Sequence, residues 1–295
     1  MKDLANKVAA VTGAGSGIGR ALTIQLAQHG CHLALSDVNE KGLQETADLI
    51  SQYGVKVTTQ KLNVADKDAF YAWADQVVAD HGRVNLIFNN AGVALAGTIQ
   101  GLNIEDYEWV MDINFYGVLY GTKAFLPHLE ASGEGHVVNI SSIFGVAAQP
   151  LMSGYNASKF AVKGFTESLR QELDITRSCV SATVVHPGGI KTNIAQSTRY
   201  SNSADAVTGT DEAESKQEFE DLFLTTPETA ARFIIKAVKK NKRRALIGPD
   251  AWVNDFLIRM FPAGYQKVVV KAIEWKANQN RKRKAKLQKE KEKHA

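Results

Sequence analysis

The stretch "VTGAGSGIGRA", residues 11–21, places Gly13, Gly17 and Gly19 between an apolar run and a helical pattern. Glycines at this spacing allow a tight turn and a close approach of the backbone to a diphosphate, and the following helix offers unpaired N–H groups to the anion. A turn made only for packing is also rich in glycine. The position directly after the strand-like run "KVAAVT" (7–12) favours a phosphate-binding loop that opens a dinucleotide-binding unit.

Short β-branched runs alternate with amphipathic helical stretches along the whole chain. The predicted strands are residues 7–12, 32–37, 55–62, 84–90, 136–141, 180–187 and 244–248. The predicted helices are residues 17–30, about 40–53, about 104–131, about 155–176 and 227–240, with another that carries Phe70, Trp73, Ala74, Val77 and Val78. This alternation implies parallel strands joined by right-handed crossovers. We therefore predict an α/β fold, a doubly wound parallel sheet of the Rossmann type with helices on both faces.

No internal repeat and no linker divides the chain. We expect a single catalytic domain over residues 1–249 and a C-terminal helical extension over 250–295. Within the domain, the polar segment 190–226 lacks clear periodicity and is predicted to be a long substrate lid. The extension carries Trp252, Phe256 and neighbouring apolar residues that cluster on one helical face. Three roles stay open for it: covering the substrate mouth or a neighbouring subunit, lying in a membrane interface, or binding a partner.

The basic charge of the protein is concentrated in its tail. Residues 281–295 hold eight Lys/Arg and two Glu, so this tail carries +6 while the whole chain carries +4. Such a tail is most often solvated, so we expect no nucleic-acid partner and leave attraction to an anionic membrane open.

The cysteine content and the start of the chain bear on its location. Cys31 and Cys179 both begin apolar runs, so we expect buried free thiols, as in a reducing compartment. The first residues lack the apolar core of a signal peptide, and no apolar run is long enough to cross a bilayer. These features predict a cytoplasmic protein, with peripheral membrane contact left open.

An acidic residue, Asp37, follows the glycine loop at the end of the next predicted strand. Asp37 ends the second predicted strand, 18 residues beyond Gly19, where a carboxylate would accept hydrogen bonds from an adenosine ribose. The same carboxylate would repel a 2′-phosphate, and Val38 and Asn39 follow it in place of a cation. Arg20 lies just inside the helix and is poorly placed as a phosphate clamp. We therefore predict NAD as cofactor rather than NADP.

The segment "YNASK" places Tyr155 and Lys159 four residues apart at the start of a predicted helix. At this spacing the two side chains share one helical face. Most such pairs are ordinary exposed neighbours. The alternative is a tyrosine whose proton is made available for chemistry by an adjacent ammonium.

Six segments together carry a resemblance to the classical short-chain dehydrogenase/reductase family. They are "TGAGSGIG" (12–19), "NNAG" (89–92), "DINFYG" (112–117), "NISSIFG" (139–145), "YNASK" (155–159) and "PG" (187–188) with Thr192. The resemblance is continuous over residues 7–192 and implies a Rossmann fold that runs on to about residue 248.

The resemblance implies roles for the matching residues. Tyr155 is the acid/base, Lys159 binds the nicotinamide ribose, Ser142 hydrogen-bonds the substrate oxygen, and Asn114 anchors a water that links Lys159 to solvent. The implied cofactor-binding residues are Gly13, Gly15, Ser16, Gly17, Ile18, Gly19, Asp37, Asn63, Val64, Asn90, Ala91, Gly92, Tyr155, Lys159, Pro187, Gly188, Ile190 and Thr192. Asn63 departs from the acid common at this position, and its carbonyl oxygen still suits an adenine amino group. No metal site is expected.

A free tyrosine has a pKa near 10. The ammonium of Lys159 and an oxidised nicotinamide are predicted to lower the pKa of Tyr155 by about two to three pH units, toward the range of an efficient general base. Apolar residues surround the predicted catalytic residues in sequence: Val93, Ala94, Phe144, Val146, Ala147, Leu151 and Met152.

We therefore predict an NAD(H)-dependent oxidoreductase that interconverts a small hydrophobic, secondary alcohol and its ketone or aldehyde. Two alternatives remain: a membrane-peripheral dehydrogenase of lipid-like or retinoid alcohols, and a non-catalytic cofactor-binding regulatory protein. Family members commonly associate through two long helices. The resemblance therefore implies a homodimer or homotetramer, since the corresponding helices here carry the apolar residues Val118, Leu119, Phe160 and Phe165.

Overall fold

The computed structural model describes the backbone of residues 1–294 and the side chains as far as Lys286, with those of Lys289, Glu290 and Glu292 beyond it. The end of the predicted basic tail, Ala295, and the side chains of Leu287, Gln288, Lys291, Lys293 and His294 lie outside the described residues.

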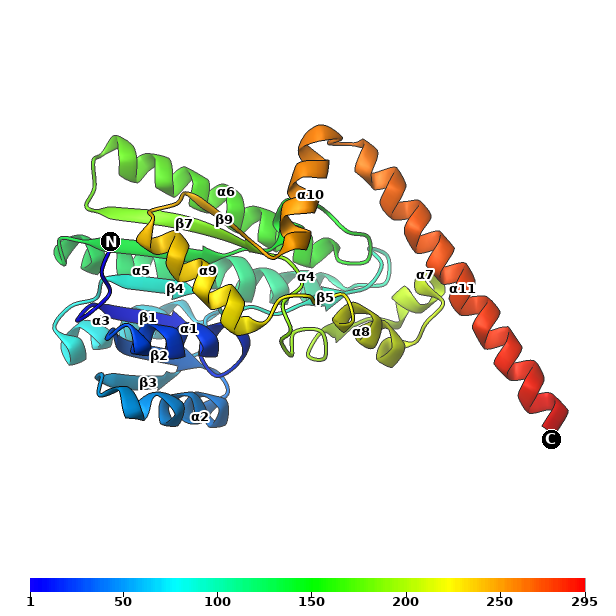
Figure 1. Ribbon diagram of the computed structural model, residues 1–295, viewed down its shortest axis with the longest axis horizontal. Coiled ribbons are helices and arrows are strands. Elements are labelled where there is room, and N and C mark those ends of the chain that lie inside the picture. Colours follow the sequence, from blue (N-terminus) through cyan, green and yellow to red (C-terminus); the bar gives the residue numbers. More distant parts are fainter. Residues whose placement is uncertain (295) are drawn as a thin grey trace.

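Seven parallel strands form the central sheet, in the order β3-β2-β1-β4-β6-β7-β9 (Figure 1). Their bounds are β1 Val8–Thr12, β2 His32–Asp37, β3 Val57–Lys61, β4 Leu86–Asn89, β6 Gly135–Ile140, β7 Val180–Pro187 and β9 Arg244–Ile247. Two short strands, β5 Leu95–Ala96 and β8 Arg199–Tyr200, pair beside the sheet. The predicted doubly wound parallel sheet is confirmed.

Helices cover both faces of the sheet (Figure 1). One face carries α1 Gly17–Gln28, α2 Glu40–Ile50 and α9 Pro227–Lys239, and the other carries α3 Lys67–His81, α5 Gly117–Ala131 and α6 Ser153–Ile175. The remaining helices are α4 Ile104–Met111, a π turn Asp112–Tyr116, α7 Asp205–Thr208, α8 Glu212–Glu220, α10 Pro249–Met260 and α11 Gly264–His294. Short 3-10 turns lie at Ser51–Tyr53, Ile143–Gly145 and Asn202–Ala204. Every residue of β1, β4 and β6 is buried, as expected for strands covered on both faces.

Local sequence explains where several of these helices begin. The Asn39 side chain accepts a hydrogen bond from the Gly42 N–H and starts α2, directly after Asp37. Thr226 caps α9, and Pro227 occupies its first turn. The predicted helix over 104–131 is continuous, but one π turn interrupts its α-helical ladder at 112–116.

Three expectations differ from the structure. The segment 190–226 is not a loop, because it contains β8, α7 and α8, and α8 starts with a capping box between Asp211 and Glu214. Cys179 is exposed, since it lies in the turn before β7, whereas Cys31 is fully buried. Val118 points into the core rather than outward. Among the helices that the structure describes, none combines the length and hydropathy needed to cross a bilayer.

A ladder of buried polar side chains joins the sheet to α6. Asn89 on β4 donates to the Asn139 Oδ1 atom on β6 at 2.8 Å, and Asn139 donates to the Thr166 hydroxyl on α6 at 3.0 Å. Thr166 in turn donates to the Val162 carbonyl oxygen. Because all of these side chains are buried, the ladder fixes the height of α6 over the ends of β4 and β6.

We predict that Asn139→Ala lowers the free energy of unfolding by about 2–4 kcal/mol, because it removes a buried hydrogen bond to each of its two neighbours and leaves a small cavity. Urea denaturation followed by circular dichroism measures the change. Asn278→Ala, at an exposed amide on α11, is the control and should stay within about 0.5 kcal/mol of the wild type. Equal stability of the two variants would contradict a structural role for the ladder.

Candidate active site

One pocket of about 660 Å³ opens at the carboxyl ends of the strands. The pocket lies between β1 and β4, where the order of the strands across the sheet reverses. This switch point is the usual ligand position in open parallel sheets. Most of the residues predicted from the sequence line it. They are Gly13, Ser16, Gly17, Ile18, Asp37, Asn63, Val64, Asn90, Ala91, Gly92, Ser142, Tyr155, Lys159, Pro187, Gly188, Ile190 and Thr192.

Three predicted residues, Gly15, Gly19 and Asn114, lie behind the pocket wall and shape it. The Gly15 N–H donates to the Asp37 carboxylate at 2.8 Å. A Cβ atom at Gly19 would lie 2.0 Å from the Gly13 carbonyl oxygen, so only glycine lets the first turn of α1 fold against the loop.

Hydrogen bonds from β4 brace the glycine loop. The Thr12 hydroxyl accepts from the backbone N–H groups of Asn90 and Ala91, at 3.0 and 3.1 Å. The Asn90 side chain donates to the carbonyl oxygens of Thr12 and Gly13. The two loops at the switch point are therefore held as one unit.

Arg20 is bound to protein groups beside this loop through Nε and Nη2. Its guanidinium donates to the carbonyl oxygens of Gly15 and Gly42 and to the Thr46 hydroxyl, and it forms an ion pair with Glu45. This arrangement leaves Asp37 as the charged side chain that lines the pocket at the end of β2.

Ser142, Tyr155 and Lys159 meet at the end of β6. The Tyr155 and Lys159 side chains are 8% and 4% exposed, and the Lys159 Nζ atom lies 5.7 Å from the centre of the Tyr155 ring. Lys159 Nζ donates to the Ile140 carbonyl oxygen at 3.1 Å, and the Ser141 hydroxyl donates to the Lys159 carbonyl oxygen at 2.8 Å. Tyr155 and Lys159 are therefore not an ordinary pair of exposed neighbours, which was one of the two interpretations of their spacing.

Burial controls the titration of both groups. It raises the pKa of Tyr155, and a hydrogen bond from Ser142 offsets this only in part. Burial also lowers the pKa of Lys159 to about 8. The predicted lowering of the Tyr155 pKa includes the charge of an oxidised nicotinamide and stays a prediction, and burial of the phenolate acts against it.

Asn114 occupies the π turn and is fully buried. Its Oδ1 atom accepts from the Val93 N–H at 2.8 Å, and its amide donates to the Val93 carbonyl oxygen and the Ser158 hydroxyl. The side chain thus ties the loop after β4 to α6, and all its hydrogen bonds go to protein groups.

His186 lies directly behind Ser142. Its Nδ1 atom is 2.9 Å from the Ser142 carbonyl oxygen, and burial lowers the pKa of its imidazole to about 4. A neutral ring must donate from Nδ1 to a carbonyl, which fixes the backbone at Ser142.

The wall above Tyr155 is apolar and aromatic. Phe144 packs edge-on against Tyr155 and stacks on Phe219, which contacts Phe223. Of the seven apolar residues expected near the substrate, Val93, Ala94, Phe144 and Met152 line the pocket, whereas Val146, Ala147 and Leu151 do not.

Several pocket residues were missed from the sequence. Phe219 and Phe223 lie four residues apart within an acidic segment, a spacing that signals one helical face. Asp250 lies three residues after β9, in the first turn of α10, and its carboxylate accepts from the Gly189 N–H at 2.7 Å. Asp250 could have been predicted as a pocket residue, because the carboxyl ends of parallel strands lie at the same edge of the sheet.

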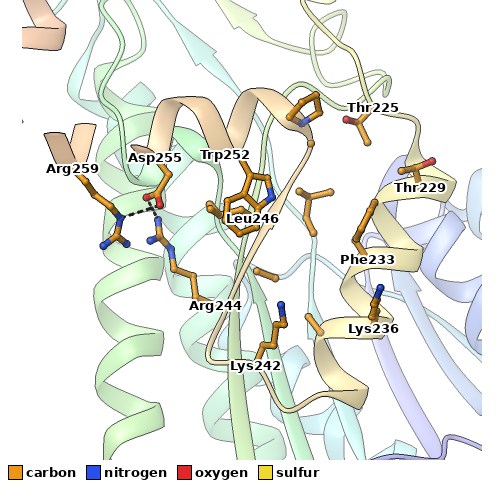
Figure 2. Close-up of a pocket in the computed structure, with 15 residues that line it drawn as sticks. Thr225, Thr229, Phe233, Lys236, Lys242, Arg244, Leu246, Trp252, Asp255 and Arg259 are labelled. Atoms are coloured by element: carbon orange, nitrogen blue, oxygen red, sulfur yellow. Dashed lines mark hydrogen bonds and ion pairs between the residues drawn. The ribbon is translucent and has the colours of Figure 1, made fainter. Parts of the chain in front are cut away.

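A second hollow, of about 550 Å³, lies along the outer side of β9 between α9 and α10 (Figure 2). Phe233 and Trp252 face it from the two helices, and Asp255 at its rim pairs with Arg244 and Arg259 at 2.6 and 3.0 Å. It contains none of the residues predicted from the motifs, so the pocket at the switch point is the candidate active site.

Comparison with known proteins gives consistent matches. Residues 7–203 match the family model described as short chain dehydrogenase. SadH of Mycobacterium tuberculosis, which is named as an oxidoreductase, is 45% identical over 273 residues, covering 92% of this chain and 97% of SadH. Cyclohexanol dehydrogenase of Acinetobacter is 37% identical over 188 residues, covering 63% of this chain and 74% of that enzyme.

A solved structure agrees with the sequence matches. The short-chain dehydrogenase/reductase of Burkholderia phymatum, in complex with NAD, has a TM-score of 0.80 at 28% identity and covers 88% of this chain and 95% of that chain. Since the family model spans most of the chain and SadH matches it almost end to end, the protein belongs to the short-chain dehydrogenase family of oxidoreductases.

Proposed function

We propose that the protein is an NAD(H)-dependent oxidoreductase that interconverts a hydrophobic secondary alcohol and its ketone, with Tyr155 as general acid/base. The observation that carries this proposal is the meeting of Ser142, Tyr155 and Lys159 in the pocket that also holds the glycine loop and Asp37. A regulatory protein that only bound the cofactor would have no physical need for Ser142 and Tyr155 beside Lys159 in this pocket.

The residues present suit a dinucleotide. The loop at Gly13–Gly19 leaves no room for side chains where a diphosphate would approach, and α1 begins there with no acidic residue in its first turn. Asp37 at the end of β2 suits ribose hydroxyls, and the backbone from Pro187 to Thr192 lies on the side of Tyr155. When bound, the dinucleotide supplies the hydride donor or acceptor.

The chain's own residues handle the proton. Tyr155 would donate its phenolic proton to the substrate oxygen as a ketone is reduced, and would accept the alcohol proton in the reverse direction. Ser142 would hydrogen-bond the same oxygen, because its hydroxyl is fixed beside the phenol. Lys159 would bind ribose hydroxyls and favour the phenolate. Because both N–H groups of the Asn114 side chain are used by Val93 and Ser158, any water that Asn114 anchors would donate a hydrogen bond to one of its oxygen atoms.

The electrostatics near β2 favour NAD over NADP in this proposal. A 2′-phosphate would meet the Asp37 carboxylate, and Arg20 is held by Gly15, Gly42, Thr46 and Glu45 and cannot offset that repulsion. The NAD complex of the Burkholderia phymatum relative supports the same choice.

The substrate class follows from the pocket wall. Phe144, Met152, Phe219 and Phe223 surround Tyr155, and the cation among the described lining residues is Lys159 itself. A carboxylate or phosphate substrate would find no counter-ion there. The relative named cyclohexanol dehydrogenase supports a compact apolar alcohol.

We further propose that residues 1–249 form the catalytic domain, with 190–226 as its lid and 250–295 as an extension. Tyr116 and Phe160 are 40% and 42% exposed on the α5–α6 side, which supports a homo-oligomer through that face. Light scattering after size exclusion would report the assembly mass.

One observation favours a second candidate, an enzyme that acts on lipid-like alcohols at a membrane surface. The extension exposes large apolar side chains: Trp252, Val253, Phe256, Leu257, Met260, Phe261, Val268, Val270 and Trp275. Co-sedimentation with anionic liposomes that is lost on deletion of 250–295 would support this candidate, and no co-sedimentation of the full chain would reject it.

Tyr155→Phe should lower kcat/KM for alcohol oxidation by about 10²–10⁴-fold, because the proton acceptor is lost while the ring remains. Absorbance at 340 nm with NAD and a panel of secondary alcohols measures this. NAD binding, followed by calorimetry, should persist in the variant. Turnover equal to the wild type would refute the assignment of Tyr155.

Oxidation should become faster as the pH rises. Because burial raises the pKa of Tyr155, the phenol is protonated at pH 7, and the phenolate fraction grows about tenfold per pH unit below that pKa. We expect kcat/KM for oxidation to increase from pH 7 to pH 9, and ketone reduction to show no such increase. A flat oxidation profile would contradict a titrating base.

Asp37→Ala should reduce the preference for NAD over NADP by about 10- to 100-fold, because it removes a charged hydrogen-bond acceptor and a repulsive charge. The ratio of kcat/KM for the two cofactors measures the change independently of folding losses. Asp37→Asn, which keeps an acceptor for the Gly15 N–H, separates the charge from the loop contact. An unchanged ratio in both variants would remove Asp37 from cofactor choice.

Lys159→Met should abolish turnover yet stabilise the cofactor-free protein by about 1–3 kcal/mol at pH 7. The folded-state pKa of about 8 lies below the ordinary lysine value of 10.5, so the cost of burying the ammonium is complete below pH 8 and disappears between pH 8 and 10.5. Thermal unfolding of both proteins should therefore converge as the pH rises through that window. A destabilised variant at pH 7 would contradict this prediction and would show that the hydrogen bond from Nζ to Ile140 outweighs the cost of burying the ammonium.

A further inference from the structure

Helix α11 returns from the elbow after α10 and passes beside the lid helices α7 and α8 (Figure 1). Two of its side chains are buried there, Ala277 at 3% and Asn280 at 7% exposure, although most of α11 is exposed. The Asn280 amide donates to the Thr208 carbonyl oxygen at the end of α7, at 3.2 Å, and to the Glu218 Oε1 atom on α8, at 3.3 Å. One side chain thus links both lid helices to α11.

The backbone at Gly209 packs closely against α11. Gly209 ends α7 with φ of +71°, and a Cβ atom there would lie 3.1 Å from the Ala277 carbonyl oxygen and 3.2 Å from the Arg281 side chain. The Arg281 guanidinium also donates to the Ala206 carbonyl oxygen at 2.8 Å. The backbone of the lid therefore touches α11 directly.

Charge complementarity reinforces the contact. Glu218 pairs with Lys276 at 3.0 Å, and Glu214 pairs with Arg283 and Lys284, both at 2.8 Å. The hydrogen bond from Lys284 holds the pKa of Glu214 below its usual value. The acidic residues of α8, which stand out in the sequence, thus face the basic stretch of α11.

An adjacent side of α8 reaches the catalytic pocket through Phe219. Phe219, the residue after Glu218, stacks on Phe144, which packs against the Tyr155 ring. Phe223 follows one turn later and contacts Phe219 with ring centres 5.0 Å apart. Any shift of α8 relative to α11 would therefore move the apolar wall above the phenol.

We infer that α11 is a strap that holds α8 over the catalytic pocket, and that Asn280 is a positioning residue for the hydrophobic substrate. This inference rests on the proposed oxidoreductase function, since it concerns the substrate side of the same pocket. Asn280 is not among the residues that line the pocket, and it acts through Thr208, Glu218 and Phe219.

The test compares two asparagines on one helix. Asn280→Ala removes the buried amide, whereas Asn278→Ala removes an exposed amide two residues away. Asn280→Asp keeps the side-chain shape, loses the donors and places a carboxylate beside Glu218. With the full chain, NAD and a secondary alcohol, Asn280→Ala should raise KM for the alcohol about five- to tenfold and leave KM for NAD and kcat within about twofold. Asn280→Asp should show at least the same effect, and Asn278→Ala none.

Hydrogen exchange gives a readout that does not need turnover. Amides over residues 205–223 should exchange about tenfold faster in Asn280→Ala than in Asn278→Ala, with the central strands unchanged. A wild type without activity would refute the proposed function, but the exchange rates of the two variants could still be compared. Unchanged exchange and unchanged KM in Asn280→Ala would overturn the strap, as would a loss of protection spread over the whole sheet.

Discussion

The meeting of Ser142 and Tyr155 depends on a reciprocal pair of hydrogen bonds between the end of β6 and helix α6. Lys159 donates through Nζ to the Ile140 carbonyl oxygen, and the Ser141 hydroxyl donates back to the Lys159 carbonyl oxygen. Strand alternation turns Ser141 toward α6 and Ser142 toward the pocket, so one residue fixes the helix and the next faces the phenol. The same lysine is thus a structural bridge and part of the reactive group, which joins the geometry of the site to the fold beneath it.

The site contrasts satisfied and unsatisfied polar groups. Thr12, Asn90, Asn114 and His186 are committed to backbone partners, and they hold the loops after β1, β4 and β6 in fixed positions. Lys159 carries three donors and has one protein acceptor among the described residues, and Tyr155 has Ser142. The loops are held in place, while Lys159 and Tyr155 keep hydrogen-bonding capacity for a ligand. Such a site can bind a polar ligand without rearranging.

The sequence predicted the sheet well, because most of its strands are short apolar runs and four of the six motif segments fall at strand ends. It predicted the pocket residues for the same reason. It could not predict α7 and α8, whose helices depend on caps and on contacts with α11 more than 50 residues away. The sequence also could not predict that burial raises the pKa of Tyr155, since the spacing to Lys159 is visible in the chain but the depth of burial is not. Asp250 was missed because its contact with Gly189 joins two distant strand ends.

The two thiols differ in a way that has a practical use. Cys31 is buried, and its pKa is raised to about 12, so it is a poor nucleophile at neutral pH. Cys179 is exposed at the amino end of β7, on the edge of the sheet opposite the pocket. A maleimide reagent should therefore attach a dye or a solid support at one defined point of the native chain, with the catalytic edge directed away from the attachment.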